Sequence, residues 1–122
     1  MFTRIDHIAI NVKEIDKVSQ FYQNIFGFGA LLETIIPSGK KIVYLKLSDT
    51  ILEISETNQN DIKGSHFCLH TDNFEQDYNY LISLGIEVFQ KVHPTAPRTH
   101  NEIAWRRAVF VGIAGEHIEI RG

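Results

Sequence analysis

Two histidines and two glutamates hold matching places in two copies of a repeated pattern, and together they could bind a metal ion. The first copy opens with R-I-D-H-I-A-I-N-V and the second with G-S-H-F-C-L-H-T, which aligns His7 with His66. Each copy closes on an apolar segment, L-E-I or I-E-I, which aligns Glu53 with Glu119. Two neutral imidazoles and two carboxylates would form a neutral nitrogen–oxygen shell around a divalent cation. These four residues are therefore the predicted metal ligands.

The neighbours of these residues predict where their side chains point. His7 lies beside Ile8, His66 beside Phe67, and both glutamates lie between aliphatic residues. Because successive strand residues face opposite sides of a sheet, the apolar neighbours would pack beneath helices while His and Glu face the other way. Four such groups would be costly to bury without partners, and a cation would remove that cost.

The spacing of the repeat changes between its two ends. The histidines are offset by 66 − 7 = 59 residues and the glutamates by 119 − 53 = 66, so the second copy holds seven extra residues. Residues 40–54 align with residues 106–120 at the larger offset. This alignment makes Lys40-Lys41 equivalent to Arg106-Arg107 and predicts a structural, strand-edge role for all four cations.

The periodicity of apolar residues predicts a βαβββ order in each half. The sequence predicts an α+β fold and one domain, 1–122, made of modules 1–55 and 64–122 with a polar linker 56–63. Gly27 is the expected C-terminal cap of the first helix, and Asp72 or Asn73 the N-cap of the second. The expected strands are 5–12, 28–36, 41–47, 51–55, 65–71, 86–92, 105–111 and 117–121, the helices are 13–26 and a segment over 74–84, and 92–103 is an expected loop.

Composition argues against several classes of protein. The net charge is −3, the pI is about 6.0, and no basic run exceeds two residues, which argues against nucleic acid as a partner. The amino-terminal stretch has no apolar signal-like run and no segment resembles a membrane span, which favours a cytoplasmic protein with no membrane partner. The single cysteine, Cys68, cannot form an internal disulfide and is expected to be a buried small hydrophobe.

The motifs resemble those of the vicinal oxygen chelate superfamily, which includes glyoxalase I, methylmalonyl-CoA epimerase, extradiol dioxygenases and fosfomycin-resistance enzymes. The opening D-H-I-A-I-N-V, with a helix ending F-Y-Q-N-I-F-G-F, resembles the start of that family, and F-V-G-I-A-G-E-H-I-E-I resembles its usual ending. The resemblance implies a glyoxalase-like fold, in which tandem βαβββ modules form an open, cupped mixed sheet with the helices outside.

The resemblance also implies a metal site and a reaction. His7, Glu53, His66 and Glu119 match the metal-ligand positions of glyoxalase I, with Zn, Ni, Co, Mn or Fe as candidate ions. Glu119 matches the catalytic base and Glu53 the second acid–base group, although pseudo-symmetry leaves their order open. The implied activity is that of a metal-dependent lyase acting through a metal-stabilised enediolate on the hemithioacetal of a 2-oxoaldehyde and a thiol.

Other functions of the same superfamily remain open. They are an acyl-CoA epimerase or isomerase, a thiol transferase for an epoxide antibiotic, and a metal-free protein that binds a small molecule or drug. The expected partners are a small-molecule substrate, thiol-linked in the leading interpretation, and a second copy of the chain in a homodimer, with each site built from one chain or two. Further residues could line the site, either from the expected loop or from the strands of the ligands: His93, Arg98, His100, Trp105, His70 and His117.

Overall fold

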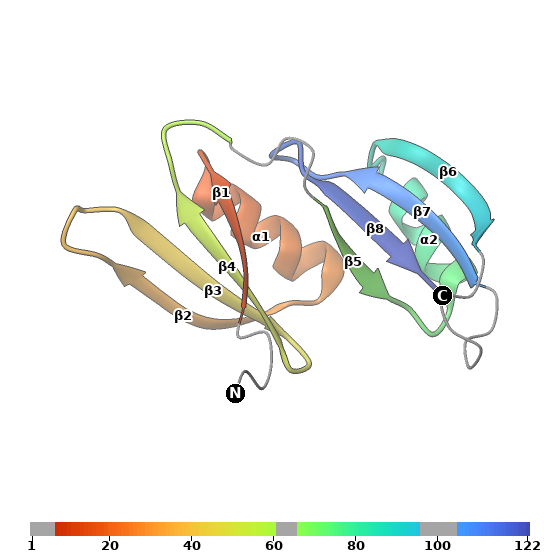
Figure 1. The fold of residues 1–122 in the computed structure, drawn as a ribbon, viewed down its shortest axis with the longest axis horizontal. Helices are drawn as coiled ribbons and strands as arrows, with labels where there is room; N and C mark the ends of the chain where they lie inside the picture. Colours follow the sequence, from red (N-terminus) through yellow and green to blue (C-terminus); the bar gives the residue numbers. More distant parts are fainter. Residues whose placement is uncertain (1–6, 61–65, 96–104) are drawn as a thin grey trace. The chain divides into compact units, whose positions relative to one another are not determined.

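The chain divides into two compact units, Met1–Lys63 and Gly64–Gly122. The computed structural model describes residues 7–60, 66–95 and 105–122. The predicted α+β fold of two βαβββ modules is confirmed (Figure 1). That the two units form one domain stays a prediction. The elements are β1 (Ile8–Val12), α1 (Ile15–Phe26), β2 (Gly29–Ile35), β3 (Lys41–Leu47), β4 (Thr50–Glu56), β5 (His66–His70), α2 (Phe74–Ser83), β6 (Val88–Thr95), β7 (Trp105–Val111) and β8 (His117–Arg121).

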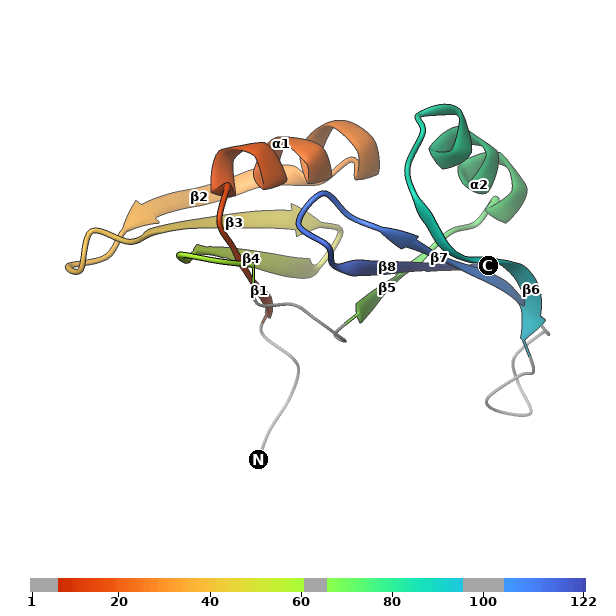
Figure 2. The same cartoon turned by 90° about the horizontal axis from the view of Figure 1, so that it is seen from above.

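Each unit contains a four-stranded mixed sheet with the same topology. The strand orders are β1-β4-β3-β2 and β5-β8-β7-β6. In both, the first strand pairs in parallel with the last, and the remaining pairs are antiparallel. The helix of each unit covers one face of its own sheet (Figure 2). In each unit, this topology places the histidine, at or directly before the start of the first strand, beside the strand that carries the glutamate.

The α1 helix forms because its apolar residues recur at helical spacing and meet the sheet. Ile15, Val18 and Tyr22 are buried on this stripe, which faces a core that includes Leu45 and Ile54. The helix ends at Gly27 as predicted, because this residue has a φ of 74° and donates its N–H to the carbonyl of Tyr22.

The α2 helix begins at a side-chain cap, one of the two predicted. The Asn73 side chain accepts a hydrogen bond from the backbone N–H of Gln76 at 3.4 Å. Phe74 and Leu81 are its buried residues.

No helix of the described residues is long and apolar enough to cross a membrane.

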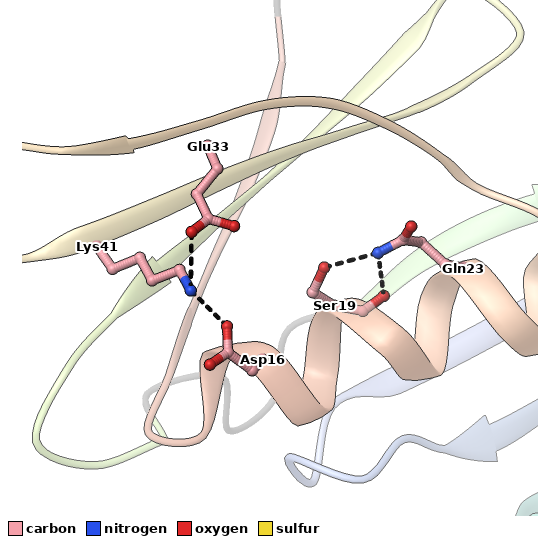
Figure 3. A network of polar contacts seen from close by, with 5 residues as sticks. All are labelled: Asp16, Ser19, Gln23, Glu33 and Lys41. Atoms are coloured by element: carbon pink, nitrogen blue, oxygen red, sulfur yellow. Dashed lines mark hydrogen bonds and ion pairs between the residues drawn. The ribbon is translucent and has the colours of Figure 1, made fainter.

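A cation connects each helix to its sheet. In unit 1, the Lys41 ammonium contacts Asp16 of α1 and lies 2.9 Å from Glu33 of β2 (Figure 3). These two carboxylates, Asp16 foremost, raise the pKa of Lys41 above its ordinary value of 10.5. In unit 2, the Arg106 guanidinium lies 3.0 Å from Glu75 and 5.0 Å from the ring centre of Phe74, both in the first turn of α2.

The hairpins that lead into the glutamate strands differ by one residue. Lys46 pairs with Ile51 in unit 1, while Val111 pairs with His117 in unit 2. Four residues, 47–50, therefore separate the paired positions in the first hairpin, and five, 112–116, in the second. The predicted equivalence of Lys40-Lys41 with Arg106-Arg107 is wrong by one position, because the extra turn residue shifts β7 against β8. The structural counterpart of Lys41 is Arg106, and that of Ile42 is Arg107.

The β6 strand extends further than predicted. Residues 93–95, assigned only to a loop, continue the strand, since His93 pairs with Arg107 and Pro94 with Arg106. Proline is tolerated there because β6 is an edge strand, whose outward backbone positions need no ladder partner. The rest of the expected loop, including Arg98 and His100, lies outside the described residues, as does the side chain of Trp105.

Cys68 also differs from the expectation of a buried residue. Its side chain is exposed, because it lies on the face of the sheet turned away from α2. It pairs in register with Glu119 of β8, so the thiol shares a sheet face with two of the predicted metal ligands.

Candidate metal centre

The first histidine–glutamate pair lies at the β1–β4 contact of unit 1. The Nε2 atom of His7 is 3.2 Å from Oε2 of Glu53, and the Ser55 hydroxyl donates a hydrogen bond to Oε1 at 3.1 Å. His7 directly precedes β1, whose residue Ala9 pairs in register with Glu53. The side chains are 39% and 17% exposed, so the imidazole remains accessible while the carboxylate is largely enclosed.

The second pair lies at the β5–β8 contact of unit 2. The Nε2 atom of His66 is 3.5 Å from Oε2 of Glu119. The Arg107 guanidinium approaches the other carboxylate oxygen, with NH1 3.8 Å from Oε1. Glu119 is only 8% exposed, compared with 58% for His66. The guanidinium of Arg107 therefore acts on this carboxylate in addition to His66, whereas the counterpart in unit 1 accepts a hydrogen bond from a neutral hydroxyl.

Strand alternation explains why both pairs face away from the helices. Leu52 and Ile54, on either side of Glu53, are buried in the core of unit 1, and Ile118 and Ile120 are buried around Glu119. Each glutamate must then lie on the opposite face of its strand. The predicted orientation of the side chains follows from this alternation alone.

The donor set and its spacing fit a divalent cation. Two ligand atoms of a tetrahedral centre with bonds of about 2.1 Å are about 3.4 Å apart, close to the nitrogen–oxygen distances of 3.2 and 3.5 Å. Within either unit, the described residues provide no third His, Cys, Asp or Glu to complete a cluster. Each unit supplies two of the four predicted ligands, half of a tetrahedral shell.

Unit 2 also contains a cavity of about 180 Å³ beside its pair. Phe89 and His117 form part of its wall, with ring centres 4.1 Å apart in a stacked arrangement. Arg107 lines it as well and donates from Nε to Nε2 of His93 at 2.9 Å. The described residues that line it are His66, Phe89, Gln90, Arg107, Val109, His117 and Glu119.

Sequence reasoning missed Arg107 and Phe89 as residues of the site. Arg107 was assigned a strand-edge role because a constant offset pairs it with Lys41, and only the length of the 112–116 turn could have indicated otherwise. Phe89 carries no signal of its own in an apolar strand. His117 was expected near Glu119 and does line the cavity, whereas His70 lies 3.2 Å from Asp72.

The sequence of the chain matches a known family. The profile of the Glyoxalase/Bleomycin resistance protein/Dioxygenase superfamily matches residues 4–104. The chain belongs to this superfamily. The matched segment contains His7, Glu53 and His66, while Glu119 lies beyond it.

Solved structures of similar fold span nearly the whole chain, each with a TM-score of 0.75. A glyoxalase family protein from Enterococcus faecalis is 24% identical, over 99% of this chain and 98% of that one. The fosfomycin resistance protein FosX from Listeria monocytogenes, in complex with Mn(II) and sulfate, is 17% identical over 100% and 93%. Lactoylglutathione lyase from Agrobacterium tumefaciens is 18% identical over 99% and 94%. These likenesses establish the shared fold.

Proposed function

We propose that this protein is a metal-dependent enzyme whose divalent cation is held by His7, Glu53, His66 and Glu119. The observation that supports the proposal is the recurrence of one arrangement in both units. In each, an imidazole nitrogen lies 3.2 to 3.5 Å from a carboxylate oxygen, at equivalent strand positions and on the face away from the helix. A structural role for each residue alone would not require both pairs to recur together.

The proposed chemistry is proton transfer next to a carbonyl group. When bound, the cation would supply Lewis-acid stabilisation of the negative charge that develops on the substrate oxygen. Glu119 accepts the proton from the adjacent carbon and returns the same proton to that carbon or to its neighbour. Glu53 is the second acid–base group, and pseudo-symmetry allows the two glutamates to exchange these roles. The two histidines would orient the carboxylates, since each imidazole nitrogen lies 3.2 or 3.5 Å from an oxygen of its partner glutamate.

The leading activity is that of a lactoylglutathione-lyase-like enzyme acting on the hemithioacetal of a 2-oxoaldehyde and a thiol. Its support is the similarity to the lyase from Agrobacterium tumefaciens and the complete set of four ligand residues. Because each unit supplies only two ligands, the four meet either within one chain or, in a homodimer, between units of two chains.

A second candidate is the opening of an epoxide antibiotic. It is favoured by the similarity to FosX. A second similar structure is a mutant of FosX in complex with Mn(II) and 1S,2S-dihydroxypropylphosphonic acid. This candidate is also favoured by the arginine on the cavity wall of unit 2. For both candidates we propose the same four ligands, so the choice between them concerns the substrate.

Metal content is the first test. Protein purified without chelator should contain about one divalent ion per four-ligand site, and His7→Ala and His66→Ala should each lose most of it. His70→Ala is the matched control, because His70 lies two residues from His66 on the same strand and pairs with Asp72. Wild-type metal content in His7→Ala would contradict the four-ligand assignment.

The metal-loaded protein is then assayed with methylglyoxal and a panel of thiols. Turnover with one thiol supports the lyase, whereas metal without turnover shifts the proposal to fosfomycin opening or to the epimerisation of an acyl thioester. Absence of bound metal, together with no uptake when ions are added, would leave a metal-free binding protein as the better account.

A further inference from the structure

The Arg107 side chain lines the cavity of unit 2 without being held rigidly by Glu119. The NH1-to-Oε1 distance of 3.8 Å is longer than a hydrogen bond, so the contact is a charge attraction only. Among the described residues, its side chain donates a hydrogen bond from Nε to Nε2 of His93. The arginine is 34% exposed, and its terminal nitrogens can therefore turn toward a ligand in the cavity.

The charges around the cavity favour an anion. Arg121 lies opposite Arg107 in the register of β7 and β8, and His66 and His117 add two imidazoles that can donate hydrogen bonds. Glu119 is the one carboxylate among the described residues that line the cavity. In the proposed function its charge is directed to the cation, which leaves the guanidinium without a full counter-charge.

The cavity has the size and the walls for a small charged group on a short apolar stem. At about 30 Å³ per water molecule in the liquid, its 180 Å³ corresponds to about six water-sized groups. The stacked rings of Phe89 and His117, together with Val109, form an apolar wall beside the arginine. A guanidinium is well suited to an oxyanion because its planar donors match two oxygens at once.

Unit 1 has no such cation at the corresponding place. The residues equivalent to Arg107 and Arg121 are Ile42 and Ser55, which pair with each other in the same register. The cation of this hairpin, Lys41, lies on the helix side with Asp16 and Glu33. The arginine is therefore a feature of one half of the repeat and is not needed to form a histidine–glutamate pair.

We propose that Arg107 is the anchor for an anionic group of the substrate, an oxyanion of the carboxylate, phosphonate or phosphate kind, in the cavity of unit 2. That the bound anion belongs to a substrate rests on the function proposed above. Binding of a small anion by Arg107 is predicted whether or not that function is correct. The stem that joins the oxyanion to the reacting carbon lies against Phe89 and His117.

The test is direct binding of small probes to the intact protein, followed by titration in ¹H–¹⁵N spectra. The titrations are run without metal and with added Zn(II), which is diamagnetic and does not broaden the signals. The probes are acetate, methylphosphonate and inorganic phosphate, with acetamide as the uncharged comparison. Arg107→Met should weaken binding of the preferred anion about 10- to 150-fold, the loss expected for hydrogen bonds to a charged group. Arg107→Lys should lose less, because it keeps the charge but not the planar fork.

Arg106→Met is the matched control. It removes the neighbouring arginine of the same strand, which lies on the helix side against Glu75 and Phe74, and should bind the probes as the wild type does. Thermal unfolding checks that each variant is folded. Binding that is equal in Arg107→Met and Arg106→Met, or absent for all three anions, would overturn the anchor. If the wild-type protein binds the anion but binds no metal ion, the proposed function is overturned and the anchor stands.

Discussion

The two units have the same fold and the same histidine–glutamate pair, but they differ in what surrounds the carboxylate. In unit 1, Glu53 contacts His7 and accepts from the hydroxyl of Ser55. In unit 2, Glu119 contacts His66 and faces the guanidinium of Arg107 beside a cavity. The common part is what a metal ion would need from each half. The divergent part is what would allow the site to bind the two ends of a substrate differently.

A single turn residue accounts for much of this difference. Because strand side chains alternate between faces, moving β7 by one residue against β8 exchanges the residues that face the glutamate. At offset 66 the helix-facing cation of the hairpin would be Arg107, whereas in the structure it is Arg106, which contacts Glu75. Arg107 is thereby brought to the Glu119 face. A repeat can thus bring a charged residue to the face of its glutamate by changing its turn while its core stays the same.

The largest expected effect comes from replacing the two glutamates one at a time. Glu119→Gln and Glu53→Gln keep the size of the side chain but remove the proton acceptor, so each should lower kcat by about 10²- to 10⁴-fold. The measurement is kcat together with metal content in each variant. The variant that keeps its metal but loses more activity identifies the base.

Ser55→Ala serves as the control for this comparison, because it removes the hydroxyl that holds Glu53 and leaves both carboxylates intact. It should lower activity by less than either glutamine variant. Near-wild-type activity in both glutamine variants, with metal retained, would show that neither carboxylate transfers the proton.

The fold, and the sheet face on which each glutamate lies, could be predicted from the sequence because both depend on local signals. Alternating apolar residues around Glu53 and Glu119 determine which face each glutamate occupies, and the repeat shows that the same βαβββ order occurs twice. Gly27 and Asn73 mark helix ends through their own backbone and side-chain preferences. Each of these features can be recognised within a few residues of sequence.

Features that depend on pairing across strands were not predictable in the same way. The position of Arg107 depends on how many residues the 112–116 turn accommodates, and the extension of β6 through Pro94 depends on its pairing with β7. The exposure of Cys68 depends on which face of β5 the helix covers. In each case the local pattern is compatible with two structures, and a contact between residues distant in sequence determines which one forms.

The turn that sets this register should be sensitive to a single methyl group. A Cβ atom added at Gly112 would lie 2.1 Å from the carboxylate of Glu116, which is buried and accepts from the N–H of Ala114. Gly112→Ala should lower the free energy of unfolding by about 2 to 4 kcal/mol, from overpacking and the lost hydrogen bond. Urea unfolding measures this loss.

Two controls separate the steric cause from a general effect of glycine replacement. Gly39→Ala, in the β2–β3 turn of unit 1, places its Cβ in open space and should cost only about 1 to 2 kcal/mol, from the left-handed φ of 83°. In a Glu116→Ala background the clash is gone, so Gly112→Ala should then cost much less than in the wild type. Equal costs in both backgrounds would contradict the steric explanation.

The smallest expected effect distinguishes the cations that connect each helix to its sheet. The raised pKa of Lys41 means that the folded state holds this proton more tightly than the unfolded chain. Its stabilisation is therefore complete below about pH 10, under the unfolded value of 10.5, and is lost as the pH rises through the folded pKa. The stability gap between wild type and Lys41→Met should be small at pH 8 and should close once the pH has risen above the raised pKa of the folded state. For Arg106→Met the gap should persist over the same range, because arginine stays charged there. A Lys41 gap that stays unchanged from pH 8 through the titration of the lysine would show that the side chain stabilises unit 1 through its hydrocarbon stem, and the charged bridge to Asp16 would then contribute nothing.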